Sequence, residues 1–226
     1  MTRMDPPVPE AVGIPVSDIT IDGDLTVPTP TAGLVVFAHG SGSSRFSRRN
    51  RAVAEALTAG GFATLLLDLL TREEEALDQH TGQFRFDVDR LARRVVAAID
   101  WAGTRPVLAP LPIGCFGAST GAAAALMAAA ERPTRVAAVI SRGGRPDLAG
   151  DALPRVEAPT LLIVGGHDEM VIDLNEVARR RLRAPAQTVI VPGATHLFEE
   201  PGALEQVARL TLEWCQLYLT TPPSGS

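Results

Sequence analysis

Apolar residues along this chain gather into short continuous runs, and the segments between the runs have helical periodicity. Six runs of four or five residues contain few polar positions; they lie at residues 34–38, 63–67, 113–116, 136–140, 160–164 and 188–191. Strands that do not alternate polar and apolar residues are buried on both faces, as in a parallel sheet. The pattern therefore predicts a set of buried, mostly parallel strands.

The segments between these runs carry helix signals. Residues 49–59 end at a Gly60-Gly61 pair suited to a helix C-cap, residues 121–130 are rich in alanine, and residues 87–101 and 203–218 are amphipathic. Alternating strands and helices predict an α/β fold, a three-layer α/β/α sandwich with right-handed crossovers around a mostly parallel sheet. Ligands of such sheets bind at the carboxyl ends of the strands.

Two further segments affect the edges of this sheet. Residues 19–21 and 25–27 are strand-like and flank Asp22-Gly23-Asp24, which predicts an N-terminal antiparallel hairpin with its turn at that tripeptide. Residues 71–85 are a longer connection after a strand. This connection either closes over a substrate or is a solvated loop.

Composition narrows the class of protein. The 226 residues, 46% of them hydrophobic, predict one domain over 1–226 with loose ends at 1–13 and 220–226. A net charge of −5 argues against nucleic acid and membrane partners. All 21 basic residues are arginine, which excludes a lysine base, a Schiff-base lysine and a Walker-type lysine. Without a secretory signal or membrane-spanning run, we expect a cytoplasmic monomer or homodimer in which Cys115 and Cys215 are buried, reduced thiols.

The candidate nucleophile lies between a strand and a helix. Residues 112–116 run into Gly117-Ala118-Ser119-Thr120-Gly121, and the alanine-rich helix follows, which is the context that a G-x-S-x-G elbow requires. Small flanking residues let neighbouring main chains approach a serine held in strained backbone. We expect Ser119 to be the nucleophile of a serine hydrolase; the alternative is a small-residue turn that packs a helix on the sheet.

A serine hydroxyl needs a base, and the chain offers four histidines. His196 follows the last predicted strand and so lies on the edge that displays the elbow. The carboxylate that orients the imidazole should end a strand on the same edge, and Asp168 does so after a glycine turn. The order Ser119, Asp168, His196 is the order of triads on this kind of fold. A surface-loop histidine and a helix N-cap aspartate are the alternatives.

Acyl transfer also needs amide donors for the oxyanion of the tetrahedral intermediate. Thr120, directly after the nucleophile, supplies one amide, and Ser41 in the loop after the first parallel strand supplies the other, with Gly42 as an alternative. A rival interpretation makes residues 40–44 a phosphate cradle, but they lack the G-x-G-x-x-G spacing and a Walker lysine. This chemistry needs no cofactor and no metal.

Together these residues resemble the α/β-hydrolase superfamily over residues 14–218. Three segments look most like its dienelactone hydrolase-like branch: His39-Gly40-Ser41-Gly42, Gly166-His167-Asp168 and Gly193-Ala194-Thr195-His196. Dienelactone hydrolases proper have a cysteine nucleophile, whereas this elbow holds Ser119, so the resemblance points to ordinary carboxylic esters. Residues 141–159 are too few for the lid domain of many relatives, which implies an α/β-hydrolase fold without a cap domain and an open site.

The expected function is a carboxylic ester hydrolase that cleaves small or flexible small-molecule esters, lactones included, through an acyl-enzyme. Arg142, which leaves a strand on the catalytic edge, and Arg45, beyond the oxyanion loop, are candidates to hold a substrate carboxylate. A structural salt bridge is the alternative for each arginine. The alternative functions are an acyltransferase or thioesterase on the same triad, or a non-catalytic binding protein on a hydrolase scaffold.

Overall fold

The computed structural model describes residues 7–220 and contains one eight-stranded sheet in the order β1-β2-β4-β3-β5-β6-β7-β8. The β1–β2 and β2–β4 pairs are antiparallel, and all other pairs are parallel. The strands are β1 (Glu10–Val16), β2 (Ile19–Thr26), β3 (Leu34–Ala38), β4 (Ala63–Leu67), β5 (Ile113–Ala118), β6 (Val136–Arg142), β7 (Thr160–Gly165) and β8 (Ala186–Val191). The helices are α1 (Arg48–Ala59), α2 (Arg72–Thr81), α3 (Val88–Gly103), α4 (Thr120–Glu131), η1 (Pro146–Arg155, a 3-10 helix), α5 (Glu169–Arg181) and α6 (Ala203–Tyr218).

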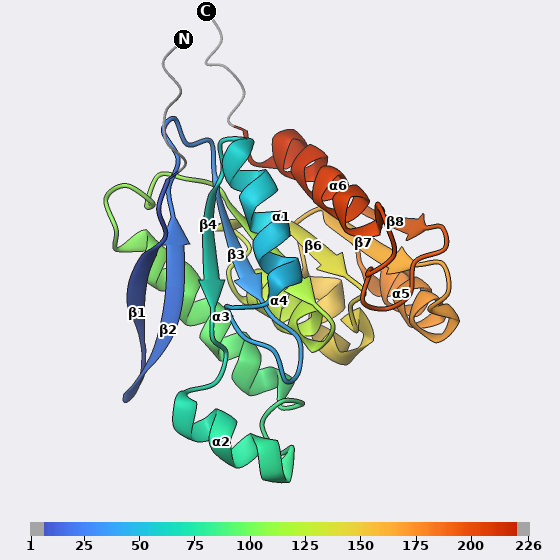
Figure 1. Cartoon of the computed structure of the whole chain (residues 1–226), viewed down its shortest axis with the longest axis horizontal. Helices are drawn as coiled ribbons and strands as arrows, with labels where there is room; N and C mark the ends of the chain where they lie inside the picture. Colours follow the sequence, from blue (N-terminus) through green and yellow to red (C-terminus); the bar gives the residue numbers. More distant parts are fainter. Residues whose placement is uncertain (1–6, 221–226) are drawn as a thin grey trace, which may run out of the picture.

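Helices cover both faces of the sheet (Figure 1). Helices α1 and α6 pack on one face, where Phe37 and Phe116 contribute to the core, and α3 and α4 pack on the other, around Cys115 and Leu126. The predicted three-layer sandwich without a cap domain is confirmed, and so is the burial of Cys115 and Cys215, which are free thiols. The parallel strands all end at one edge, where the loops after β3, β5, β6, β7 and β8 meet.

The N-terminal hairpin exists, but its predicted turn was wrong. Ser17 and Asp18 connect β1 to β2, and Asp22-Gly23-Asp24 lies inside β2. The tripeptide follows strand alternation, because Ile21 and Leu25 are buried while the carboxylates on the other face pair with arginines. Arg45, in the loop after β3, contacts Asp22 and Asp24, and Arg51 in α1 contacts Asp24. A Cβ on Gly23 would lie 3.2 Å from Leu65 Cδ1, so the glycine allows close strand packing rather than a turn.

Two other expectations change. Residues 10–13, expected as part of a loose end, pair with residues 22–25 in the first half of β1; residues 1–6 and 221–226 lie outside the described part of the chain. The connection at 71–85 contains α2, which lies beyond the carboxyl ends of β3 and β4 (Figure 1). Among residues 7–220, no helix combines the length and the hydrophobicity that crossing a membrane requires.

Candidate active site

Ser119 occupies a strained turn between β5 and α4. Its backbone has φ 51° and ψ −124°, a conformation that residues with a side chain rarely adopt. The glycines of the elbow make this turn sterically feasible: a Cβ on Gly117 would lie 2.4 Å from Ala122 Cα, and one on Gly121 would lie 2.3 Å from the Ala38 carbonyl oxygen. The sequence G-x-S-x-G therefore produces a half-buried serine at the start of α4.

His196 and Asp168 form a hydrogen-bonded pair. Nδ1 of His196 lies 2.6 Å from Oδ2 of Asp168, and because a carboxylate only accepts, Nδ1–H is the donor. This bond leaves Nε2 of a neutral imidazole unprotonated and able to accept a proton. The Asp168 side chain is 15% exposed and that of His196 is 39% exposed, so water reaches the imidazole while the carboxylate is largely shielded.

The turn at residues 142–145 contacts both the elbow and the histidine loop. The Ser119 amide donates to the Arg142 carbonyl, and the Arg145 amide donates to the Ser119 carbonyl at 3.0 Å. A Cβ on Gly143, which has φ 50°, would lie 3.0 Å from the His196 carbonyl oxygen, so this glycine lets the backbone of the histidine loop approach the turn. Buried Phe198, also at positive φ, anchors the histidine loop two residues beyond His196. The fold thus brings Ser119, Asp168 and His196, three residues singled out from the sequence, to one edge of the sheet.

Two of the other three histidines have clearly different surroundings. His39 is buried; its Nε2 accepts from the Leu69 amide at 3.0 Å, and its Nδ1 lies 2.8 Å from the Gly40 carbonyl. Burial lowers the pKa of His39, which keeps it neutral and makes it a structural support of the loop after β3. His80 bonds to the backbone of its own helix, α2.

The residues expected to form the oxyanion hole lie together. A Cβ on Gly40 would lie 2.9 Å from Ser119 Cβ, so the loop after β3 passes directly over the nucleophile. Ser41 Oγ lies 3.0 Å from Thr120 Oγ1 and donates to the Arg85 carbonyl at 3.1 Å. Because the one Ser41 hydroxyl proton goes to Arg85, the Thr120 hydroxyl is the donor between the two. The two residues whose amides are the candidate oxyanion donors are therefore linked by their side chains.

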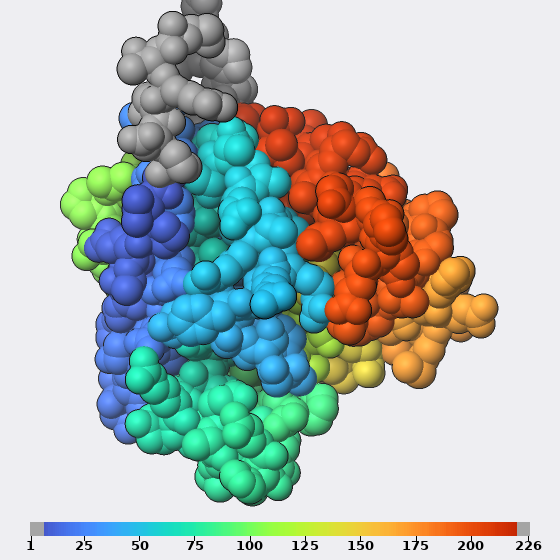
Figure 2. Space-filling model, in the orientation of Figure 1, coloured from blue at the N-terminus to red at the C-terminus, as the bar shows by residue number. Residues whose placement is uncertain are grey.

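Asp78 and Arg85 support this loop, and sequence reasoning missed both. Asp78 is fully buried and accepts from the Phe84 amide at 2.6 Å and from Arg85 Nε at 2.6 Å. These bonds close the segment that contains α2 back on itself and hold the Arg85 carbonyl against Ser41. In the space-filling view this segment forms a lobe beneath the residues that follow β3 (Figure 2). The sequence does contain a signal for the helix that carries Asp78: Thr71 and Glu74 form a capping box, which marks the start of α2.

The two candidate substrate arginines differ in their surroundings. The Arg45 guanidinium contacts the carboxylates of Asp22, Asp24 and Asp68, and its side chain is 12% exposed. This network supports the structural salt bridge for Arg45 rather than contact with substrate. Arg142 is also buried, but its Nε and Nη1 have no hydrogen-bond partner among the described residues.

Comparisons with known proteins agree with this fold. The model of the dienelactone hydrolase family matches residues 21–216. The crystal structure of a dienelactone hydrolase from Anabaena variabilis is 56% identical, with a TM-score of 0.93 over 95% of this chain and 99% of that one. Est1E from Butyrivibrio proteoclasticus has a similar fold at 20% identity, with a TM-score of 0.76 over 92% of this chain and 98% of that one.

A protein of Mycobacterium tuberculosis, provisionally named a phosphoribosyl transferase, is 56% identical over 223 residues. The match covers 98% of this chain and 49% of that protein, so the chain spans about half the length of this relative.

Proposed function

Because this chain belongs to the dienelactone hydrolase family, we propose that it is a serine hydrolase that cleaves carboxylic esters through an acyl-enzyme on Ser119. One observation carries the proposal: the 2.6 Å bond between His196 and Asp168 lies on the same sheet edge as the strained Ser119 elbow. A strained serine, an oriented imidazole and a shielded carboxylate are the parts that activate a hydroxyl as a nucleophile.

The proposed reaction has two steps. His196 Nε2 takes the Ser119 hydroxyl proton as Oγ attacks the ester carbonyl, and the imidazolium then gives that proton to the leaving alcohol. Water, deprotonated by the same nitrogen, attacks the acyl-enzyme and releases the acid and free Ser119. In both steps the backbone amides of Ser41 and Thr120 stabilise the oxyanion, and Asp168 stabilises the imidazolium.

Serine is favoured over cysteine as the nucleophile. Burial raises the pKa of the Cys115 and Cys215 thiols to about 12, and neither is exposed to a substrate. The open site lets bulk water reach the acyl-enzyme as the acceptor, since the His196 side chain is 39% exposed and η1 is the only element between β6 and β7. A small or flexible ester suits such a site.

The name of the mycobacterial relative describes a protein about twice as long as this chain. A phosphoribosyl transferase must hold a diphosphate, and the glycine loop after β3 passes over Ser119 instead of forming the start of a helix-bound phosphate site. The residues of this chain therefore support hydrolysis rather than phosphoribosyl transfer.

The Ser119→Ala variant tests the proposal. We expect 4-nitrophenyl acetate hydrolysis to fall by about 10⁴-fold or more, as for other serine hydrolase triads, while the folded structure is retained because alanine fits the same turn. Thr195→Ala, in the histidine loop but with its hydroxyl bonded to Glu200, is the matched control and should keep turnover. Undiminished hydrolysis by Ser119→Ala would remove the basis of the proposal, and loss of activity in both variants would point to a folding defect.

A further inference from the structure

A buried asparagine of α5 is bonded to the turn that holds the nucleophile. Asn175 is fully buried, and its Nδ2 donates to the Gly144 carbonyl at 3.0 Å and to the Val171 carbonyl of its own helix at 2.7 Å. Two carbonyl oxygens that face the same nitrogen fix the orientation of the amide, because Nδ2 is its only donor atom. The first of these bonds joins α5 to the turn at residues 142–145, 31 positions earlier in the chain.

The Gly144 carbonyl belongs to the same peptide group as the Arg145 amide, and that amide donates to the Ser119 carbonyl at 3.0 Å. This peptide bond is trans, so the group is planar and its C=O and N–H point in opposite directions. One peptide plane therefore connects Asn175 on one side with Ser119 on the other. Rotation of the plane would weaken both hydrogen bonds together.

Ser119 depends on this support because its backbone is strained. A residue with a side chain adopts φ 51° at a cost, and it keeps that conformation only where the surrounding structure holds it. The turn at residues 142–145 bonds both backbone groups of Ser119, but the bond from the Ser119 amide to the Arg142 carbonyl is long, at 3.4 Å. The bond from the Arg145 amide is therefore the firmer of the two.

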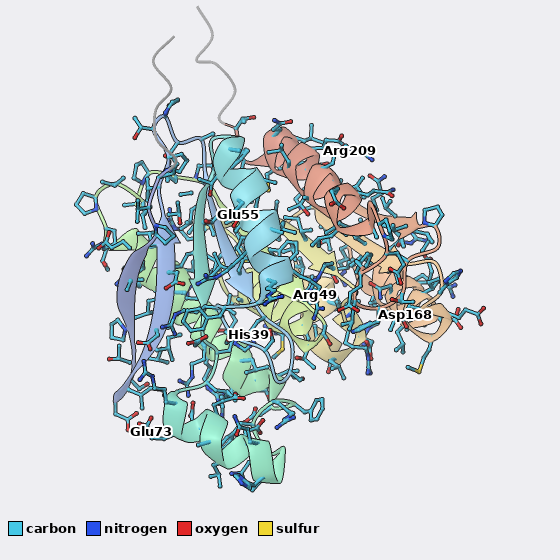
Figure 3. The ribbon with its side chains drawn as sticks, in the orientation of Figure 1. His39, Arg49, Glu55, Glu73, Asp168 and Arg209 are labelled. Carbon is cyan, nitrogen blue, oxygen red and sulfur yellow. The ribbon has the colours of Figure 1, made fainter. Side chains whose placement is uncertain are left out.

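Helix α5 also carries the carboxylate that orients the imidazole. Asp168 is the N-cap residue of α5, but its side chain accepts no bond from the helix amides and is bonded to His196 instead. The start of α5 thus lacks the side-chain cap that commonly anchors a helix. Asn175 follows Asp168 by seven residues, about two helical turns, so the two share one face of α5. Figure 3 shows Asp168 near α5, at the same end of the sheet as His39.

From these contacts we infer that Asn175 is a positioning residue for the reaction. Through the Gly144–Arg145 peptide, it sets the position of Ser119 relative to the helix that begins at Asp168. This role rests on the proposed serine hydrolase function. Asn175 itself is buried and bonds only backbone carbonyls among the described residues, so it acts on the alignment of the reacting groups.

The Asn175→Leu variant tests this role, because leucine has a similar volume and no donor. We expect the single-turnover acylation rate with 4-nitrophenyl acetate to fall by about 10- to 100-fold while KM changes by less than about threefold, since a displacement of about 1 Å can cost about 10²-fold in rate. The loss should stay within this limit because the Gly143 amide still bonds the Ile163 carbonyl of β7 at 2.7 Å. Leucine also removes the Asn175 Oδ1 atom, a buried acceptor without a partner among residues 7–220, which offsets part of the stability lost with the two bonds.

The pH profile separates positioning from a general loosening of the fold. In Asn175→Leu the apparent pKa of His196, read from kcat/KM against pH, should match that of the unmodified protein, because the bond to Asp168 is intact. A loosened fold would expose Asp168 and shift this pKa.

Thr211→Val is the matched control. Thr211 is fully buried in α6, and among the described residues its hydroxyl bonds only the Val207 carbonyl of the same helix, at 2.8 Å. The variant removes a buried side-chain bond within a helix, as Asn175→Leu does, but it leaves the turn at residues 142–145 untouched. Acylation should remain within about twofold of the unmodified protein, and urea unfolding should show that both variants are folded under the assay conditions.

Hydrogen exchange at the Arg145 amide, resolved by NMR, gives a measurement that does not depend on activity. Exchange should accelerate by about tenfold in Asn175→Leu and stay unchanged in Thr211→Val. Faster exchange together with slower acylation supports the role of Asn175. Unchanged exchange, or unchanged acylation while turnover still depends on Ser119, overturns this role and leaves the proposed function intact. Full turnover in Ser119→Ala, a variant that keeps Asn175, refutes the proposed function and with it any role of Asn175 in that reaction.

Discussion

The buried carboxylate of Asp78 offers a test of how the segment containing α2 supports the oxyanion loop. Asp78→Asn keeps the shape of the side chain, but its amide nitrogen would face Arg85 Nε, a second donor, where a 2.6 Å bond now exists. Losing one hydrogen bond to a charged group costs about 1.5–3 kcal/mol. Because Asp78 is fully buried, we expect a loss of about 3 kcal/mol in the local stability of this segment.

This loss has two measurable consequences. Amide hydrogen exchange at residues 78–87 should accelerate by about 10²-fold, since each 1.4 kcal/mol corresponds to a factor of ten. The kcat for 4-nitrophenyl acetate should fall by about tenfold, because Ser41 loses the fixed Arg85 carbonyl and its amide is less well aimed. Complete loss of one oxyanion donor costs about 10²–10³ in kcat, which sets the upper limit.

A double-mutant cycle decides whether the coupling runs through Ser41. Ser41→Ala keeps the amide but removes the hydroxyl, so its effect on kcat and that of Asp78→Asn should not add when the two are combined. Glu73→Gln, on the exposed side of the same helix, should change neither exchange nor kcat. Additive effects on kcat, or normal exchange at residues 78–87 in Asp78→Asn, would refute the reasoning.

Two other predictions concern the histidines. Asp168→Asn should lower kcat by about 10⁴-fold without unfolding the protein, because an amide in place of the carboxylate no longer fixes the tautomer of His196; steady-state kinetics and circular dichroism check this, and full activity would contradict the role of Asp168. Burial lowers the pKa of His39 below its unfolded value, so the unfolded chain binds the proton more readily and the free energy of unfolding should fall as the pH drops below about 6.5, by at most about 1.4 kcal/mol per pH unit. Urea unfolding of His39→Gln should show a weaker dependence on pH than the unmodified protein, and identical curves would contradict a neutral, structural His39.

The central strands could be predicted from sequence because burial on both faces requires a continuous run of mostly apolar residues, which is easy to recognise. Residues 34–38 and 63–67 are strands at the predicted bounds, since neither contains the alternation that an exposed face would impose. The hairpin turn was misplaced because Asp-Gly-Asp has the composition of a turn. Its aspartates are instead held by Arg45 and Arg51, which are distant in sequence. A local pattern carries no information about such partners.

The candidate site also has some features that the sequence predicts and others that only the folded structure shows. The elbow and the chain order of Ser119, Asp168 and His196 are properties of the sequence, whereas the 2.6 Å bond between the last two depends on the meeting of two loops. From the sequence, Arg45 and Arg142 are equally good candidates to hold a substrate carboxylate. Only the folded structure separates them, because three carboxylates surround Arg45 and none contacts Arg142 among the described residues.

The most direct test of the central claim is to trap the acyl-enzyme. The protein is mixed with excess 4-nitrophenyl acetate and quenched in acid within the first turnovers, and its peptides are examined by mass spectrometry. We predict an acetyl group on the peptide that contains Ser119, formed with a burst of 4-nitrophenol and absent from Ser119→Ala. Continued turnover with no acetyl group on Ser119, or an acetyl group on another residue that Ser119→Ala does not remove, would contradict the account.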